Sequence, residues 1–193
     1  MQSLANLLAA YGDDRAIADA ALHYARVEYH RPAPDSIEAA SEGLPAPAVE
    51  RLRTYVERLP QEAVTTGRGL YLVSTDARSL SLAVQFLVRN FEQARIAVCQ
   101  MRGDARPSAA DRRFALAAPV VVVERIDFLS ETVGEILRER ATLVRPLIVT
   151  SMQPPETIAD PHLRSIVRSL THRVDLSPSL SPHGSLPAES EQQ

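Results

Sequence analysis

Pro119-Val120-Val121-Val122-Val123 is the stretch of sequence that decides the fold of this protein. Four consecutive valines favour the extended backbone, because a branched Cβ packs well on a pleated surface. The run has no polar residue at alternate positions, so neither face of the strand is expected to meet water. Strands buried on both faces occur mainly in parallel sheets that carry helices on both sides. The stretch therefore predicts a central strand of a parallel α/β sheet.

Four other apolar runs lie around this strand, with helical segments between them. Further strands are expected at residues 69–74, 95–101, 145–151 and 172–176. Apolar residues at three- and four-residue steps predict helices over residues 78–91, 111–116, 131–140 and 161–170. Alternating short strands and helices are typical of a three-layer α/β fold, here with a parallel five-stranded sheet.

The chain is expected to fall into three parts. Residues 1–66 form a helical lead-in, residues 67–178 the α/β core, and residues 179–193 a disordered tail. The tail contains Ser, Pro, Glu and Gln with few apolar residues, so it cannot bury enough surface to fold. Within the lead-in, the apolar spacing predicts a helix over residues 47–59 that ends at Pro60, since proline disrupts the interior of a helix.

An apolar stripe near the N-terminus has two alternative roles. Four residues at helical spacing form it: Leu4, Leu7, Leu8 and Tyr11. The stripe either folds back onto the core of its own domain, or stays exposed and anchors a partner helix in a groove. The sequence leaves both interpretations open.

The composition excludes several classes of site. All 21 basic residues are arginine, so no mechanism that needs a lysine is available. Cys99 is the only cysteine and the five histidines show no ligand spacing, so we expect no metal site. No apolar run approaches the roughly 18 residues of a membrane span. The N-terminus also lacks the basic flank of a secretory signal, and a cytoplasmic protein without a membrane partner is expected.

Three segments carry a resemblance to a known family of ATPases. Residues 67–74, with the loop and helix that follow, resemble the strand and phosphate loop of replication initiators and helicase loaders. Residues 120–129 resemble the Walker B strand of that group, and residues 145–155 resemble its sensor strand. In this order and spacing the chain resembles the DnaA/DnaC group of AAA+ domains. The resemblance implies a P-loop NTPase-like core, here without a C-terminal lid domain.

The phosphate loop departs from the pattern that binds nucleotide. A working loop reads G-x-x-x-x-G-K-[ST], whereas the aligned residues 74–81 lack both glycines, have Leu80 at the lysine position and match only at Ser81. Asp76 adds a negative charge where phosphate would lie. Strained non-glycine residues and the lost lysine together weaken binding by roughly 4–7 kcal/mol, which moves a micromolar affinity to millimolar or worse. We therefore expect no bound nucleotide cofactor.

The other ATPase motifs are altered as well. Glu124 replaces the Asp that holds magnesium, Arg125 replaces a second acid, and Met152 occupies the polar sensor position. An arginine stays protonated and cannot serve as a base. Ile166 falls at the arginine-finger position, with Arg164 and Arg168 on either side as finger or DNA-contact candidates. The residues of the vestigial nucleotide pocket are Ser74, Thr75, Asp76, Arg78, Ser79, Ser81, Glu124, Arg125, Asp127 and Met152.

These departures predict a pseudo-ATPase that acts through partners in replication initiation or helicase loading. The resemblance implies a replication protein or an active AAA+ ATPase as partner, with DNA as another. One alternative is an atypical ATPase that uses Arg78, Ser81 and Glu124. Another is a nucleic-acid-binding module, since residues 67–178 carry net charge +3 while residues 1–66 carry −4. Its candidate contacts are Arg102, Arg106, Arg112 and Arg113.

Overall fold

The computed structural model describes residues 37–65 and 67–177, which form six helices, two 3-10 turns and one sheet. The helices are α3 (Ile37–Ser41), α4 (Ala46–Thr65), α5 (Ala77–Gln93), α6 (Ala109–Ala117), α7 (Glu131–Thr142) and α8 (Pro161–Leu170). The strands are β1 (Gly69–Val73), β2 (Val98–Arg102), β3 (Val120–Glu124), β4 (Leu147–Ser151) and β5 (Thr171–Asp175). The 3-10 turns are η1 (Ile126–Phe128) and η2 (Pro155–Thr157).

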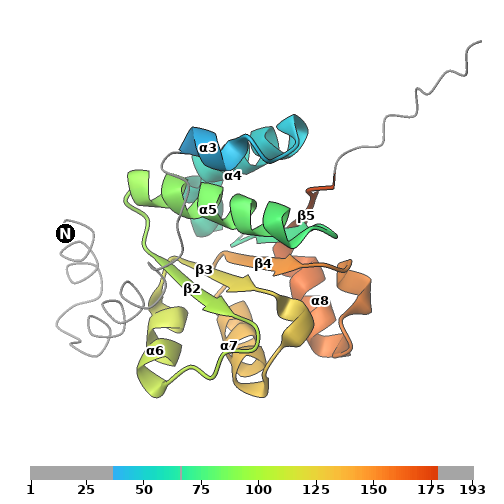
Figure 1. Ribbon diagram of the computed structural model, residues 1–193. Coiled ribbons are helices and arrows are strands. Elements are labelled where there is room, and N and C mark those ends of the chain that lie inside the picture. The colour runs from blue at the N-terminus through green and yellow to red at the C-terminus, as the bar shows by residue number, and fades with distance from the viewer. Residues whose placement is uncertain (1–36, 66, 178–193) are drawn as a thin grey trace, which may run out of the picture.

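The sheet has five parallel strands in the order β2-β3-β4-β1-β5. Figure 1 shows α3, α4 and α5 over one face of the sheet, and α6, α7 and α8 over the other. The predicted three-layer α/β fold with a parallel five-stranded sheet is therefore confirmed.

The valine run forms β3, which pairs with β2 on one side and with β4 on the other. Every residue of the strand is buried. Val121 and Val123 pack into the core beneath α6, α7 and α8, whereas Val120 and Val122 pack into the core beneath α3, α4 and α5. Because alternate side chains point to opposite faces, one strand of apolar residues serves both cores.

Some element boundaries differ from the expectations. Helix α4 does not end at Pro60 but continues to Thr65. Burial of Leu52, Tyr55 and Leu59 fixes the preceding turns, and that packing outweighs the one backbone hydrogen bond that a proline removes. Strand β2 begins at Val98 and not at residue 95, because Arg95 adopts a left-handed backbone (φ 57°) in the turn that closes α5.

Several expectations lie outside the described residues. They concern the apolar stripe at Leu4, Leu7, Leu8 and Tyr11 and the tail after residue 178. Within the described part, no helix is long and apolar enough to cross a membrane.

Two arginines hold the carboxyl end of α6. The Arg140 side chain is only 1% exposed, and its guanidinium donates to the carbonyl oxygens of Ala115, Ala118, Pro119 and Pro146 at 2.8–3.4 Å. Arg145 donates to the carbonyl oxygens of Leu116 and Ala117. The last carbonyls of a helix have no partner within the helix, and here guanidinium groups satisfy them.

Candidate functional site

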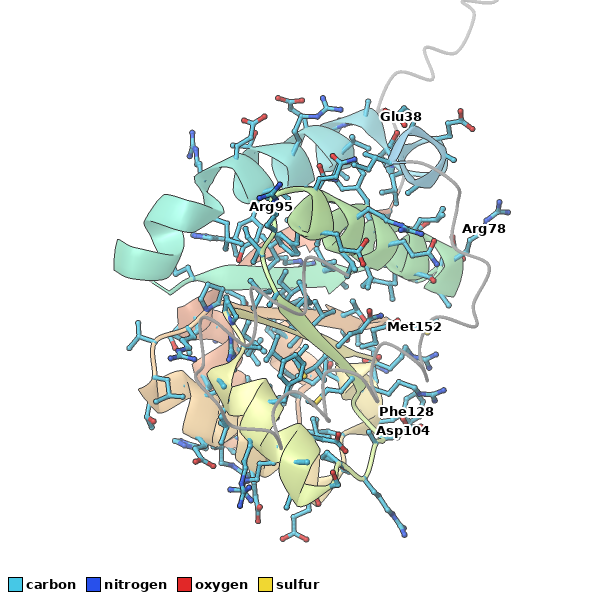
Figure 2. The ribbon with its side chains drawn as sticks, turned by 90° about the vertical axis from the view of Figure 1, so that its left-hand side faces the viewer. Glu38, Arg78, Arg95, Asp104, Phe128 and Met152 are labelled. Atoms are coloured by element: carbon cyan, nitrogen blue, oxygen red, sulfur yellow. The ribbon has the colours of Figure 1, made fainter. Side chains whose placement is uncertain are left out.

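The candidate site lies at the edge of the sheet where the carboxyl ends of β1, β3 and β4 meet. Ligands of open α/β sheets bind outside these ends. The residues that the sequence singled out for the nucleotide pocket lie at the end of β3, in the connections that leave β1, β3 and β4, and in the first turns of α5. Figure 2 shows Arg78, Met152, Phe128 and Asp104 along this edge, with Arg95, in the turn between α5 and β2, away from it.

The connection between β1 and α5 is only three residues long, Ser74 to Asp76. The Asp76 carboxylate caps α5 and accepts hydrogen bonds from the backbone N–H of Arg78 (3.0 Å) and of Ser79 (3.0 Å). It also accepts one from Ser79 Oγ (2.8 Å), while its own backbone N–H donates to Ser74 Oγ (3.1 Å). The Ser79 hydroxyl and these backbone donors hold the pKa of Asp76 below its ordinary value. The chain's own carboxylate thus occupies the N–H groups that bind phosphate in nucleotide-binding helices.

The residues that follow in α5 do not form a phosphate cradle. Leu80, at the expected lysine position, is 3% exposed and packs in the core beneath α3, α4 and α5. Ser81 lies in the second turn of the helix, where its hydroxyl accepts from Gln85 Nε2 at 3.4 Å. Arg78 is exposed, and Figure 2 shows it projecting outward from the start of α5. Thr75 is exposed in the connection itself.

At the end of β3, Glu124, the carboxylate expected at the magnesium position, already accepts a hydrogen bond within the chain. Glu124 is largely buried and accepts a hydrogen bond from Gln100 Nε2 of the neighbouring β2 at 2.7 Å. Arg125 follows in a left-handed conformation (φ 61°, ψ 56°), and its backbone N–H donates to Thr150 Oγ1 of β4 at 2.9 Å. The left-handed conformation is unfavourable for residues other than glycine. The hydrogen bond to Thr150 therefore helps to hold Arg125 in a strained backbone conformation.

The Arg125 side chain lies along η1. Its Nε is 3.9 Å from Asp127 Oδ2, and its guanidinium carbon lies 4.9 Å from the centre of the Phe128 ring. The Nε atom is buried and has no hydrogen-bond acceptor among the described residues. The residue at this position is therefore a guanidinium, where the resemblance to the DnaA/DnaC group implies a second acid.

Asp127 ties η1 to the end of β4. Its carboxylate accepts from Ser151 Oγ at 2.5 Å and from the backbone N–H of Met152 at 3.0 Å. The Gln153 carbonyl accepts from Tyr71 Oη (2.8 Å), and the Gln153 backbone N–H donates to Ser151 Oγ (2.9 Å), so the start of the loop after β4 is fixed from two sides. Burial raises the pKa of Tyr71. Although Ser151 and Asp127 form a close pair, Ser151 is buried, which excludes it as an accessible nucleophile.

Arg164 and Arg168, the two arginine-finger candidates, lie on α8 at different distances from this edge. The chain leaves β4 at the carboxyl edge of the sheet, so the first residues of α8 lie near that edge. The last residues of α8 lie near the opposite edge, where β5 begins. Arg164 is therefore the nearer of the two, and its Nε is buried without an acceptor in the described part. Arg168 lies a turn further away and is exposed, while Ile166 is buried between them.

The structure adds residues that the sequence did not single out. Tyr71, Gln100, Thr150 and Ser151 make the hydrogen bonds that fix the edge, and Phe128 is exposed beside Arg125. A polar residue inside an apolar strand, such as Gln100, is a signal that sequence reasoning could have used. Among the described residues, no group of His, Cys, Asp and Glu has the arrangement of a metal site.

Comparison with known proteins identifies relatives by structure alone. No family model and no curated protein sequence matches the chain. The crystal structure of DnaI matches with a TM-score of 0.56 at 13% identity, over 68% of this chain and 81% of that one. The DnaC helicase loader matches with a TM-score of 0.53 at 16% identity, over 68% and 89%. DnaA from Aquifex aeolicus with bound AMPPCP matches with a TM-score of 0.55 at 12% identity, over 66% of this chain and 45% of that one.

These identities are too low to carry an activity across, but the matches agree on one architecture. They confirm the resemblance to initiator and loader domains at the level of the fold. The chain has the fold of the AAA+ domains of DnaA, DnaC and DnaI.

Proposed function

We propose that this chain is a pseudo-ATPase, an AAA+-like domain that acts through binding partners without turning over ATP. The observation that carries the proposal is the Asp76 carboxylate on the N–H groups of Arg78 and Ser79. A phosphate group would need the same donors, because the free N–H groups and the positive end of the helix dipole lie there.

Electrostatics work against such an exchange. The pKa of Asp76 is lowered, so the carboxylate is ionised at neutral pH and would repel phosphate. A phosphate loop also wraps the anion with several inward-pointing N–H groups, whereas the connection here has three residues before α5 begins. Moving Asp76 aside would therefore not build the missing loop.

The end of β3 supports the same conclusion. Hydrolysis needs a group that orients or deprotonates water, and residue 125 is an arginine, a residue type that does not serve as a base. Glu124 is held by Gln100 at 2.7 Å, so a magnesium ion would compete with an existing buried hydrogen bond. The atypical ATPase that uses Arg78, Ser81 and Glu124 gains no support, since Ser81 lies in the second turn of α5 and bonds Gln85.

The biological role follows from the structural relatives and is part of the proposal. The matched proteins include a helicase loader and a replication initiator bound to single-stranded DNA. We infer that this chain works in replication initiation or helicase loading, through a replication protein, an active AAA+ ATPase or DNA.

Calorimetry with ATP and magnesium tests the central claim. We expect no binding tighter than about millimolar, from the loss of ~4–7 kcal/mol of phosphate contacts, and no release of phosphate over hours. Asp76→Asn is the matched variant, because asparagine also caps a helix but carries no charge. We expect Asp76→Asn to stay inactive in both assays. A micromolar affinity in the wild-type chain would contradict the proposal, and one that appears only in Asp76→Asn would show an intact pocket closed by a single charge.

A further inference from the structure

Strand β5 leaves one lateral side of the sheet open. It is the last strand in the order β2-β3-β4-β1-β5 and pairs only with β1 among the described residues (Figure 1). Its register with β1 is continuous from Thr171 to Asp175, so no bulge interrupts it. His172, Arg173 and Asp175 are exposed. An open edge strand presents backbone groups that can pair with a strand from another molecule.

The backbone groups that point away from β1 belong to alternate residues of β5. The Leu176 N–H donates to the Val73 carbonyl oxygen at 2.8 Å, so the backbone N–H of Leu176 faces β1. Successive residues of a strand direct their N–H and C=O groups to opposite sides. Val174 therefore also faces β1, whereas the N–H and C=O groups of Arg173 and Asp175 point outward. These are the groups to which a further strand would bond.

The two outward residues carry charges of opposite sign. Arg173 and Asp175 are two residues apart, so their side chains share one face of the sheet. Arg173 Nη2 lies 3.5 Å from Asp175 Oδ2, and both side chains are about half exposed (49% and 51%). A strand that approaches this edge therefore meets an arginine and an aspartate in a fixed order.

We propose that the occupant of this edge is a second copy of the chain, whose β5 runs antiparallel to the first and joins the two sheets into one. A twofold axis makes such a contact reciprocal. When the axis passes at Val174, Arg173 of each copy lies opposite Asp175 of the other. Each of these pairs exchanges both of its N–H···O bonds, because both residues point their backbone groups outward. The charges on that face then alternate, so each arginine lies next to two carboxylates.

The charges select this register over its neighbours. An axis at Arg173 would place two arginines opposite each other, and an axis at Asp175 would do the same with two aspartates. Like charges directly opposite are destabilising, whereas opposite charges stabilise the pair. A shift by one residue would bring outward backbone groups against groups that already face β1. Pairing centred on Val174 satisfies both the charges and the backbone.

Other pairings fit these observations less well. The only charged residue of β2, at the opposite side of the sheet, is Arg102, which binds Asp104 in the loop beyond the strand. A second β2 would therefore bring no carboxylate to it. The chain's own residues 178–193 are also a poor match for β5, because prolines cannot donate to a ladder. They contain Pro178, Pro182 and Pro187.

The proposed contact lies at the lateral side of the sheet and not at its carboxyl edge. It uses none of the residues that carry the proposed absence of ATP turnover, such as Asp76 and Arg125. The two proposals can therefore fail separately.

Sedimentation equilibrium of the full-length chain over a wide range of concentrations tests the proposal. The molar mass should rise from that of one chain towards that of two. Arg173→Asp places like charges opposite each other at both pairs. It should raise the dissociation constant of the dimer at least about 4-fold, the equivalent of ~0.8 kcal/mol for two attractive pairs that become repulsive. Combining Arg173→Asp with Asp175→Arg restores opposite charges and should restore the dimer.

Arg102→Asp is the matched control. It removes an exposed arginine that pairs with an aspartate two residues further on, at the other edge strand, and it should leave the dissociation constant unchanged. Because the Arg173 and Asp175 side chains are half exposed, their replacement should leave the chain folded, and circular dichroism checks this for every variant.

Cysteine cross-linking reports the register. Val174 lies opposite its own copy, and the Cα atoms of such a pair are about 4.5 Å apart, within the range of a disulfide. Val174→Cys should therefore give a covalent dimer under mild oxidation. His172→Cys should not, since its copy lies about 13 Å further along the paired strand. The wild-type chain, whose Cys99 is buried, serves as the blank.

Three results would overturn the assignment. The mass of a single chain at every concentration would exclude the dimer. A dimer that Arg173→Asp leaves intact, or that forms no cross-link through Val174→Cys, would use another surface. If the full-length chain stays single and a chain that ends at Ser177 forms the dimer, residues 178–193 occupy the edge instead of a second copy.

Discussion

Replacing Arg140 with methionine should be among the most damaging single changes in this fold. The side chain is 1% exposed and donates five hydrogen bonds to four carbonyl oxygens. These carbonyls belong to the end of α6 and to the residues before β3 and β4. Methionine has a similar length and fills part of the space, so the change mainly removes the donors.

The expected loss follows from the unsatisfied carbonyls. A buried acceptor without its donor costs about 1–3 kcal/mol, but carbonyl oxygens can keep a second partner and buried arginine carries its own desolvation cost. We therefore expect Arg140→Met to lower the free energy of unfolding by about 3–5 kcal/mol, out of the roughly 5–15 kcal/mol typical of a domain. Arg140→Lys keeps the charge but has three donors in place of a planar fork, so its loss should be intermediate.

Urea unfolding followed by circular dichroism measures the effect. The midpoint should fall while the m-value stays constant, since the amount of surface exposed on unfolding hardly changes. Arg112→Met is the control, because Arg112 pairs with Glu135 and Glu139 at the exposed surface between α6 and α7, where ion pairs contribute little. If Arg140→Met lowers the midpoint no further than Arg112→Met does, the reasoning about buried carbonyls is wrong.

Four further predictions follow from the site and the termini. Asp76→Ala should lower the melting temperature because α5 loses its cap, whereas Asp76→Asn should retain most of it. Hydrogen bonds lower the pKa values of Asp76 and Asp160 from 3.8. The two ionised carboxylates therefore stabilise the fold fully above pH 3.8, and this contribution is lost as the pH falls through the lowered pKa values. The free energy of unfolding, measured between about pH 6 and 2, should show this decline. Arg125→Val should unfold at least about 1 kcal/mol more easily than Arg125→Gly, because only glycine adopts a positive φ freely. The double change Leu7→Asp and Leu8→Asp tests the apolar stripe near the N-terminus. It should lower the free energy of unfolding by several kcal/mol if the stripe belongs to the core, or leave melting normal and abolish the binding of a co-purifying partner if the stripe is an interface. Normal melting with all partners retained contradicts both.

The fold was largely predictable because it depends on periodicity. The valine run and the alternation of strands and helices already predict a doubly covered parallel sheet, and β3 is buried as expected. Boundaries were less predictable, since they depend on tertiary packing. Pro60 does not end α4, and nothing in residues 95–97 distinguishes the left-handed turn at Arg95 from a continuing strand.

The polar connections of the site were not predictable from the sequence. Which of 21 arginines is buried depends on where four carbonyls converge in space, and Arg140 has no local signal for that role. The comparison with the phosphate-loop pattern indicates an unfavourable charge at Asp76. It does not predict that Asp76 caps α5, because that role depends on the helix beginning at Ala77. Likewise, nothing in the sequence around Gly103 indicates that a Cβ there would lie 2.4 Å from the Arg125 carbonyl oxygen.

Most of the polar groups at the carboxyl edge have partners within the chain; the buried Nε atoms of Arg125 and Arg164 are exceptions in the described part. Asp76 binds the start of α5, Glu124 accepts from Gln100, and Asp127 accepts from Ser151 and Met152. Buried polar groups need partners, and a domain that awaits a ligand leaves some of them open. Here the groups that would hold phosphate and magnesium join β1, β3 and β4 to their neighbours. A ligand that competes for these groups would therefore have to break hydrogen bonds that already hold the edge together.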